Sequence, residues 1–166
     1  MTITAGTDTY GTLAQADAYF ASMDAAIDAI WDAKTDPQKE VALRTACFYM
    51  EGVYDGRWKG NITSLDQVLA WPRAGVVDSE RRAVEQTAYP ERLKQAQFEL
   101  TYKTLTETLS PDIDAGGLLK SKKTGPLNKE WFAGSSPKKR FEYVDKLVAP
   151  YLTSTSPSTV NLVRGL

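Results

Sequence analysis

Helix-start signals, followed by apolar residues at helical spacing, constrain this chain more than any other feature of its sequence. Asp36 stands at a capping position, Pro37 at the first helical position and Glu40 near the first turn. The apolar residues that follow are Leu43, Cys47, Met50 and Tyr54, and a second apolar row consists of Ala42, Ala46 and Tyr49. This spacing predicts a central core helix that begins at Asp36 and ends near Gly52.

Two shorter helices are predicted before the central one. Thr12, with Gln15 at the capping-box position, starts the first, and Asp24 starts the second. Their apolar residues are Leu13, Ala16, Phe20 and Met23, and then Ile27, Ile30 and Trp31. Asp24, Asp28 and Asp32 share one face of the second helix. A divalent-cation site and a solvated face are the alternatives, and we favour the solvated face because no calcium-loop pattern surrounds the three residues.

Two further helices are predicted in the middle of the chain. A short one starts at Ser64 or Asp66 and ends before Pro72, because a residue that precedes proline disfavours helical geometry. The longest helix starts at Pro90 and runs to about Leu109. It carries two apolar rows, and these are Leu93, Ala96 and Leu100, and then Phe98, Tyr102, Leu105 and Leu109. Two rows indicate burial on more than one side of this helix.

A β-hairpin and a last helix complete the predicted fold. Residues 118–122 and 127–132 are extended segments on either side of the turn sequence Lys123-Thr-Gly-Pro126. Ser136 is expected to cap the last helix, whose apolar face consists of Phe141, Val144, Val148 and Tyr151. The fold class is therefore mainly α: a small helical bundle with a β-hairpin insertion and an extended C-terminal arm.

The last residues differ in composition from the rest of the chain. A polar, uncharged tether, Ser-Thr-Ser-Pro-Ser-Thr, precedes an apolar end around Arg164. The apolar residues of this end are Val160, Leu162, Val163 and Leu166. We divide the chain into a helical domain, residues 1–152, with a hairpin flap at about 117–133, and a flexible arm, residues 153–166. The arm is expected to add an extended segment to a partner's sheet or groove, and a frayed end is the alternative.

The chain contains no histidine, and this limits the chemistry that it can perform. Ser-His-Asp and Cys-His catalytic arrangements and histidine-based metal sites are excluded. The one cysteine, Cys47, lies in an apolar helical stretch and is expected to be a buried structural thiol. No glycine-rich phosphate loop is present. We therefore expect no enzyme, no cofactor and no bound metal.

The charge is unevenly distributed although the net charge is only −1. Residues 1–90 hold 8 Lys and Arg against 13 Asp and Glu, and residues 91–166 hold 12 against 8. The basic cluster of the second half consists of Lys120, Lys122, Lys123, Lys138, Lys139 and Arg140. It is a candidate subunit-contact or DNA-facing surface, with a solvated polar face as the alternative. Base stacking is conceivable for four aromatic residues, Tyr49, Tyr54, Trp58 and Trp71, but aromatic residues at such spacings are typical of a core.

Several short motifs resemble those of a family of tailed-bacteriophage structural proteins. The most specific is Gln67-Val-Leu-Ala-Trp-Pro-Arg73, which contains Trp71, Pro72 and Arg73. The other motifs are Tyr10-Gly-Thr-Leu-Ala-Gln-Ala-Asp-Ala-Tyr-Phe20, Trp58-Lys-Gly60, the hairpin at residues 118–127 and the ending at residues 163–166. Such proteins look like head-completion adaptors, or head-to-tail connectors, with a mainly helical fold, and they are often labelled DnaT-like single-stranded-DNA-binding proteins.

The resemblance implies a non-enzymatic neck subunit that forms a ring, typically of twelve copies, beneath the portal. Its implied partners are the portal protein, which the arm reaches, neighbouring copies of itself, tail or other neck proteins, and genomic double-stranded DNA that passes without sequence-specific contact. Its implied location is the virion neck, and the host cytoplasm during assembly. No membrane association is expected, because no apolar run approaches the roughly 20 residues that span a bilayer. The alternative function is a single-stranded-DNA-binding replication accessory protein.

Overall fold

The computed structural model describes residues 2–109 and 141–153, and the backbone of residues 122–124 and 127–129. Its helices are α1 (Leu13–Ala21), α2 (Ala25–Asp32), α3 (Asp36–Tyr54), α4 (Glu91–Thr106) and α5 (Glu142–Val148), which continues into the 3-10 turn η1 (Ala149–Tyr151). Its strands are β1 (Asn61–Ile62), β2 (Arg73–Ala74), β3 (Lys122–Thr124) and β4 (Leu127–Lys129). The predicted fold class, mainly α with a small β-hairpin, is confirmed.

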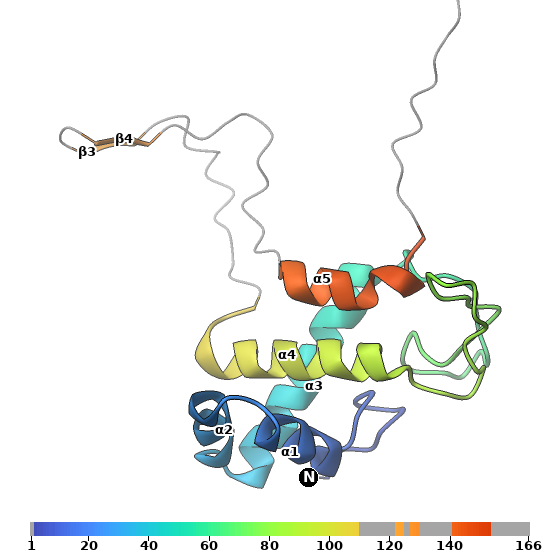
Figure 1. Ribbon diagram of the computed structural model, residues 1–166, viewed down its shortest axis with the longest axis horizontal. Coiled ribbons are helices and arrows are strands. Elements are labelled where there is room, and N and C mark those ends of the chain that lie inside the picture. Colours follow the sequence, from blue (N-terminus) through green and yellow to red (C-terminus); the bar gives the residue numbers. More distant parts are fainter. Residues whose placement is uncertain (1, 110–121, 125–126, 130–140, 154–166) are drawn as a thin grey trace, which may run out of the picture.

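Helix α4 lies at the centre of the helical body, with α5 on one side and α1 and α2 on the other, while α3 crosses it (Figure 1). Its two apolar rows enter two different core clusters. Leu93, Ala96 and Leu100 pack with residues of α3 and α5, whereas Phe98 packs with residues of α1, α2 and α3, including Phe20 and Trp31. The burial expected on two sides of α4 is therefore provided by this chain itself.

The predicted starts of the first two helices are confirmed in detail. The backbone nitrogen of Gln15 donates a hydrogen bond to Thr12 Oγ1 at 3.2 Å, and the backbone nitrogen of Thr12 donates to Gln15 Oε1 at 3.0 Å. The Asp24 carboxylate accepts a hydrogen bond from the backbone nitrogen of Ala26 at 2.9 Å. These hydrogen bonds between side chains and backbone satisfy backbone donors that the first helical turn leaves free.

The predicted bounds of the central helix need two corrections. Thr35, and not Asp36, is the residue that caps α3, and its backbone nitrogen donates to Gln38 Oε1 at 3.0 Å. The helix also continues past Gly52 to Tyr54. Tyr54 is buried, and its hydroxyl donates to Asp145 Oδ1 on α5 at 2.7 Å, so tertiary packing extends the helix beyond a residue of low helical propensity.

The short helix predicted before Pro72 does not form, and a loop connects β1 to β2 instead. The loop is held by the side chain of Gln67, whose Nε2 donates to the carbonyl oxygens of Leu69 at 2.6 Å and Pro72 at 3.0 Å. β1 pairs antiparallel with β2, with Ile62 opposite Arg73. Helix α4 was predicted to run to about Leu109, but it ends at Thr106.

The predicted β-hairpin is present, with a different first strand. β3 pairs antiparallel with β4, with Lys122 opposite Lys129 and Thr124 opposite Leu127. The first strand covers residues 122–124, whereas the sequence predicted residues 118–122. Residues 118–121 lie outside the described residues. Helix α5 begins at Glu142, and the predicted cap at Ser136 lies outside the described residues. So does nearly all of the proposed C-terminal arm, which therefore stays a prediction.

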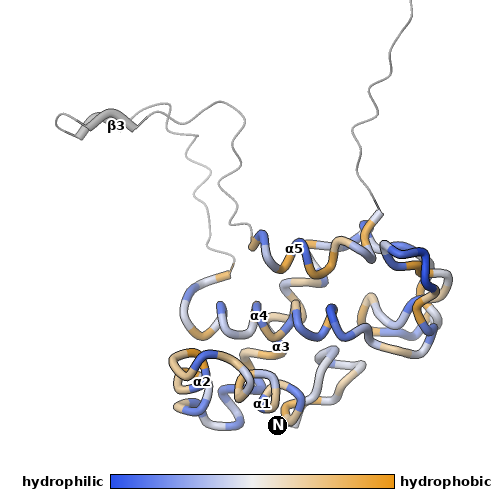
Figure 2. Tube along the Cα trace, in the orientation of Figure 1, coloured by the Kyte–Doolittle hydropathy of each residue, from blue (hydrophilic) through white to orange (hydrophobic). Residues whose placement is uncertain are grey.

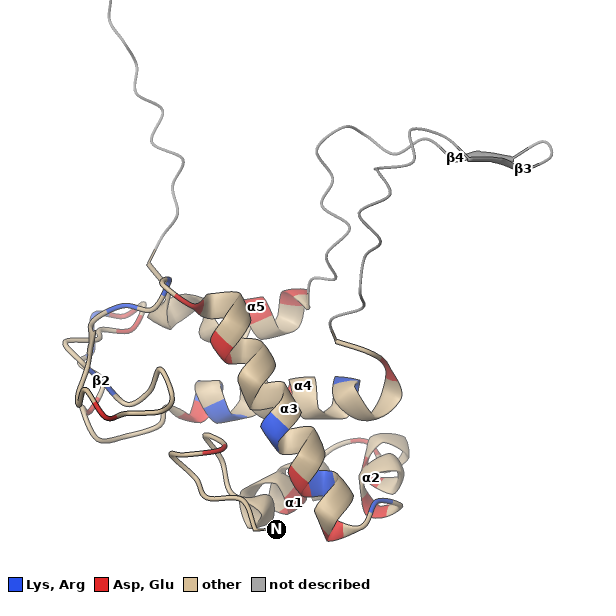
Figure 3. Cartoon of the chain, turned by 180° about the vertical axis from the view of Figure 1, so that it is seen from behind, with Lys and Arg blue, Asp and Glu red and all other residues tan. Residues whose placement is uncertain are grey.

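Hydropathy and charge follow the arrangement of the helices. Hydrophobic and hydrophilic residues alternate along α4 and α5, as expected of helices that are only partly buried (Figure 2). Acidic residues lie on α2 and at the start of α3, and α1 carries one, Asp17 (Figure 3). The acidic excess of the N-terminal half therefore lies at the end of the body that α1 and α2 form.

Candidate functional site

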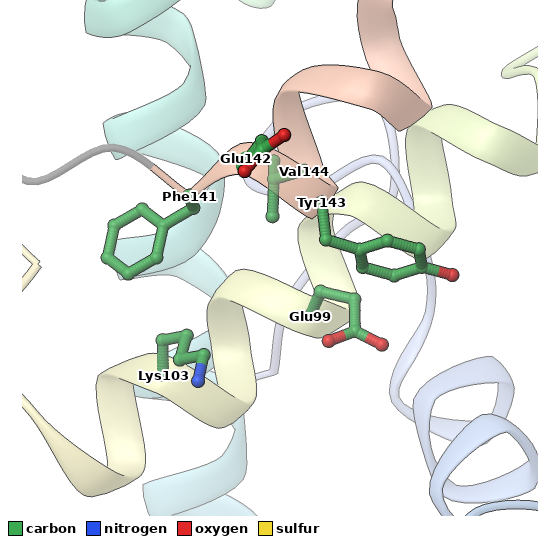
Figure 4. Close-up of a pocket in the computed structure, with 6 residues that line it drawn as sticks. All are labelled: Glu99, Lys103, Phe141, Glu142, Tyr143 and Val144. Carbon is green, nitrogen blue, oxygen red and sulfur yellow. The ribbon is translucent and has the colours of Figure 1, made fainter.

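An open groove lies between α4 and the start of α5 (Figure 4). Glu99 and Lys103 are four residues apart on α4 and therefore share one face of that helix. The first turn of α5 crosses above them. The residues that line the groove are Glu99, Lys103, Phe141, Glu142, Tyr143 and Val144. The groove thus combines aromatic rings, carboxylates and one ammonium group.

Tyr143 supplies an accessible aromatic ring at one end of the groove. Its side chain is 59% exposed, and it and Phe48 are the exposed large aromatic residues of the described part of the chain. The ring of Tyr143 lies above the carboxylate of Glu99 (Figure 4). An aromatic ring that is left open to solvent can stack on another planar ring, such as a nucleobase.

The carboxylate of Glu99 is held in place from below by α1. The hydroxyl of Tyr19 donates a hydrogen bond to Glu99 Oε1 at 2.8 Å. Burial, and then the hydrogen bond to Glu99, raise the pKa of the Tyr19 hydroxyl, so it remains a donor at neutral pH. Glu99 therefore presents a positioned acceptor group in the groove.

The other end of the groove carries Phe141 and Lys103. The Phe141 ring packs edge-on against Tyr49 of α3, with ring centroids 5.9 Å apart. The Lys103 ammonium lies 5.6 Å from the ring centroid of Tyr102 and forms no ion pair with any described residue. In contrast, Glu142 is paired with Lys146 at 3.0 Å, so part of its charge is compensated. Lys103 is thus a cation available to an anionic ligand.

The groove lies near both ends of the segment that connects α4 to α5. The helical body is described as far as Leu109 after α4 and again from Phe141. The end of α4 and the start of α5 lie at the same end of this body (Figure 1). Residues 110–140 hold seven Lys and Arg against three Asp and Glu, including all six residues of the basic cluster. The side chains of these residues, and the arm residues Val160, Leu162, Val163, Arg164 and Leu166, lie outside the described part of the structure.

The described residues of the most specific sequence motif, and Trp58 beside it, take part in packing and hydrogen bonds within the protein. Trp71 is fully buried, Trp58 is nearly so, and their rings meet edge to face with centroids 5.9 Å apart. The peptide bond between Trp71 and Pro72 is cis. Arg73 donates hydrogen bonds to the carbonyl oxygens of Lys59, Ala70 and Gly60. This motif therefore holds the loops together, and the buried rings of Trp71 and Trp58 cannot stack on a base.

Other residues that could have carried a function are buried or contact other residues of the protein. Tyr54 is buried, Tyr49 is partly buried, and the guanidinium of Arg57 lies 5.6 Å from the ring centroid of Tyr54. Cys47 is fully buried, and burial raises the pKa of its thiol, which favours the inert thiol over the thiolate. Among the described residues no cluster of metal-ligating side chains is found, and Asp24 and Asp32 are exposed.

Sequence reasoning missed Tyr143, Phe48 and the groove. Tyr143 falls between the positions of the apolar stripe of α5, and an aromatic residue off the stripe is a signal of exposure that could have been used. The meeting of Glu99 with Tyr143 has no such signal, because it depends on how α5 packs on α4. None of the described helices is long and apolar enough to cross a membrane.

These features define a small, mainly helical protein with an aromatic groove beside a basic connecting segment. The chain belongs to the family described as "Putative DnaT-like ssDNA binding protein", whose model matches residues 1–165. Neither the curated proteins nor the solved structures contain a significant match to the chain.

The family match corrects the interpretation as a phage connector. It covers nearly the whole chain and carries the description of a single-stranded-DNA-binding protein, so the assignment to a head-to-tail connector family is wrong. A neck ring, a portal, tail proteins and a role in head completion or DNA packaging have no support as function or partners. The short motifs gave a wrong family because most of their described residues pack in the core or hold the loops. Residues with such roles do not identify a binding partner. DNA is the partner class that the family description supports.

Proposed function

We propose that the protein binds single-stranded DNA and catalyses no reaction on it. The family match over residues 1–165 is the observation that carries this proposal. It agrees with the alternative function expected from the sequence. The absence of histidine from the whole chain supports the non-catalytic part, since the common acid–base and nucleophilic arrangements that depend on histidine are excluded.

The distribution of charge supports contact through the segment between α4 and α5. Non-specific binding of single-stranded nucleic acid combines basic groups that follow the phosphates with aromatic rings that stack on bases. The basic cluster Lys120, Lys122, Lys123, Lys138, Lys139 and Arg140 would supply the phosphate contacts. The groove at the two ends of this segment would supply an exposed ring, Tyr143. The acidic end around α1 and α2 would face away from the bound strand.

A titration at two salt concentrations tests the proposal. The full-length protein is added to a fluorescently labelled oligonucleotide of about 20 nucleotides, longer than the ~4–16 nucleotides that many single-strand sites occupy. Binding is expected at low salt, and its affinity should fall as salt rises, with a slope of about −0.7 for each phosphate contact. Absence of binding at low salt would overturn the proposal.

Variants locate the contact. Changing Lys120, Lys122 and Lys123 together to Ala should make the salt slope shallower by about 2, because about 0.7 is lost for each of three contacts. Single changes at these positions are compared with Lys34→Ala, which removes a lysine between Asp32 and Asp36 at the acidic end. If Lys34→Ala reduces affinity as much as Lys122→Ala does, the basic cluster is not the contact surface.

The location in the host cytoplasm, which the resemblance implies, stays a prediction.

A further inference from the structure

We propose that the groove between α4 and α5 receives one base of the bound strand, and that Glu99 makes it prefer bases with an exocyclic amino group. The inference rests on the proposed function and adds a location and a chemical preference to it. It is argued from the ring of Tyr143, the carboxylate of Glu99 and the ammonium of Lys103.

Tyr143 provides the stacking surface. Its side chain is 59% exposed although it lies on the first turn of a helix that is packed on α4. The neighbouring Val144 is buried and fixes the helix against the core, so the position of the Tyr143 backbone is set by packing. A ring presented in this way offers its face to a base without the cost of ordering a loop.

Glu99 provides the preference, because an ionised carboxylate only accepts hydrogen bonds. One of its oxygens already accepts from Tyr19 at 2.8 Å, which orients the group in the groove beneath the Tyr143 ring (Figure 4). Cytosine, adenine and guanine carry an exocyclic amino group that can donate to it. Thymine and uracil carry carbonyl oxygens at the corresponding edge, and these would face the carboxylate with like partial charge.

Lys103 provides the contact for the strand that carries the base. It lies on the same face of α4 as Glu99, one helical turn later, and is not paired with a described carboxylate. Glu142, the other acidic residue of the groove, is turned to Lys146 at 3.0 Å. A phosphate beside the inserted base therefore meets Lys103 and not an unpaired carboxylate.

The test compares oligo-deoxycytidine with oligo-deoxyuridine at neutral pH. These pyrimidines have the same size and differ only at position 4, amino against carbonyl, and at N3, which accepts a hydrogen bond in cytosine and donates one in uracil. The wild-type protein should bind oligo-deoxycytidine about tenfold more tightly, as expected for one hydrogen bond to a charged group. Glu99→Gln should remove the preference and raise the affinity for oligo-deoxyuridine, since an amide both donates and accepts. Equal affinity of the wild type for the two strands, or a preference that survives Glu99→Gln, would overturn the role of Glu99.

Substitutions of Tyr143 test the insertion of the base. Tyr143→Ala should weaken binding of both strands by about 5- to 100-fold. Tyr143→Phe keeps the ring and should bind both strands about as tightly as the wild type. Phe48→Ala is the matched control, because Phe48 is also exposed but does not line the groove. If Tyr143→Ala and Phe48→Ala behave alike, the groove is not the site, although the protein still binds DNA. Absence of binding to either strand overturns both this inference and the proposed function.

Discussion

The side-chain oxygen of Gln97 lies 3.0 Å from the backbone nitrogen of Tyr10, which precedes it by 87 residues. The same oxygen accepts a second hydrogen bond from the backbone nitrogen of Gly11 at 3.1 Å. The Gln97 Nε2 donates to the carbonyl oxygen of Leu43 on α3 at 3.0 Å. One fully buried amide thus connects α4 to α3 and to the segment before α1.

Gln97→Met should destabilise the protein by about 3 kcal/mol. The substitution keeps the approximate volume but leaves two buried backbone donors, the nitrogens of Tyr10 and Gly11, without their acceptor, each at a cost of about 1–3 kcal/mol before relaxation. Urea denaturation gives the free energy of unfolding. Gln95→Met on the same helix is the control, and its expected effect is below about 0.5 kcal/mol because Gln95 is only partly buried. Similar losses for the two variants would show that the buried amide has no special role.

Glu51 should make the protein less stable as the pH rises. Burial, as the main cause, raises the pKa of its carboxyl above 4.5, although Tyr10 and the backbone nitrogen of Ala70 donate hydrogen bonds to it. Between 4.5 and the raised value the folded protein binds more protons than the unfolded chain, so this group's contribution decreases with increasing pH. Glu51→Gln removes that dependence, and its stability relative to the wild type should increase as the pH rises from 4.5 through the raised pKa.

Asp78→Asn is the control for this pH experiment. Hydrogen bonds, first from the Arg82 backbone, lower the pKa of Asp78 below 3.8, so its favourable contribution is complete above 3.8 and is lost as the pH falls through the lowered value. The difference between Asp78→Asn and the wild type should therefore stay constant over the range in which the Glu51→Gln difference changes. A constant difference for Glu51→Gln as well would contradict the raised pKa.

The elements that could be predicted from the sequence are those with local causes. Thr12 and Gln15 are three residues apart, and Leu43, Cys47 and Met50 recur within one helix, so spacing alone gave the cap and the buried face. The end of α3 could not be predicted, because Tyr54 is held by Asp145, which follows it by 91 residues. Local propensity at Gly52 is a weaker influence than this tertiary contact.

The candidate groove could not be predicted for the same reason. Glu99 and Tyr19 are separated by 80 residues, and their hydrogen bond depends on the packing of α1 on α4. The β1–β2 loop was mistaken for a helix because its apolar residues, Val68, Leu69 and Ala70, suit either structure. Side-chain hydrogen bonds from Gln67 to the loop's own carbonyl oxygens decide in favour of the loop.

Arg81→Gly should stabilise the protein by about 1 kcal/mol. Arg81 has a φ of 62°, and a left-handed conformation costs a residue with a Cβ about 1–2 kcal/mol, part of which the greater freedom of glycine in the unfolded chain offsets. Arg81→Ala retains the Cβ and is the matched control, with no such gain expected. Thermal unfolding of both variants measures the difference, and equal melting temperatures would show that the turn at Asp78 is not strained at this position.

Leu65 and Leu69 belong to the same loop, and truncating them should change the free energy of unfolding by very different amounts. Leu69 is 2% exposed and packs in the core cluster with Trp71, so Leu69→Ala should cost about 2–5 kcal/mol from lost burial and the cavity that remains. Leu65 is 94% exposed, so Leu65→Ala should change the free energy of unfolding by less than about 0.5 kcal/mol. Urea denaturation of both variants checks the pair. A helix through this segment would instead place Leu65 and Leu69, four residues apart, on one face. Comparable losses from both changes would therefore favour that helix over the loop that Gln67 holds.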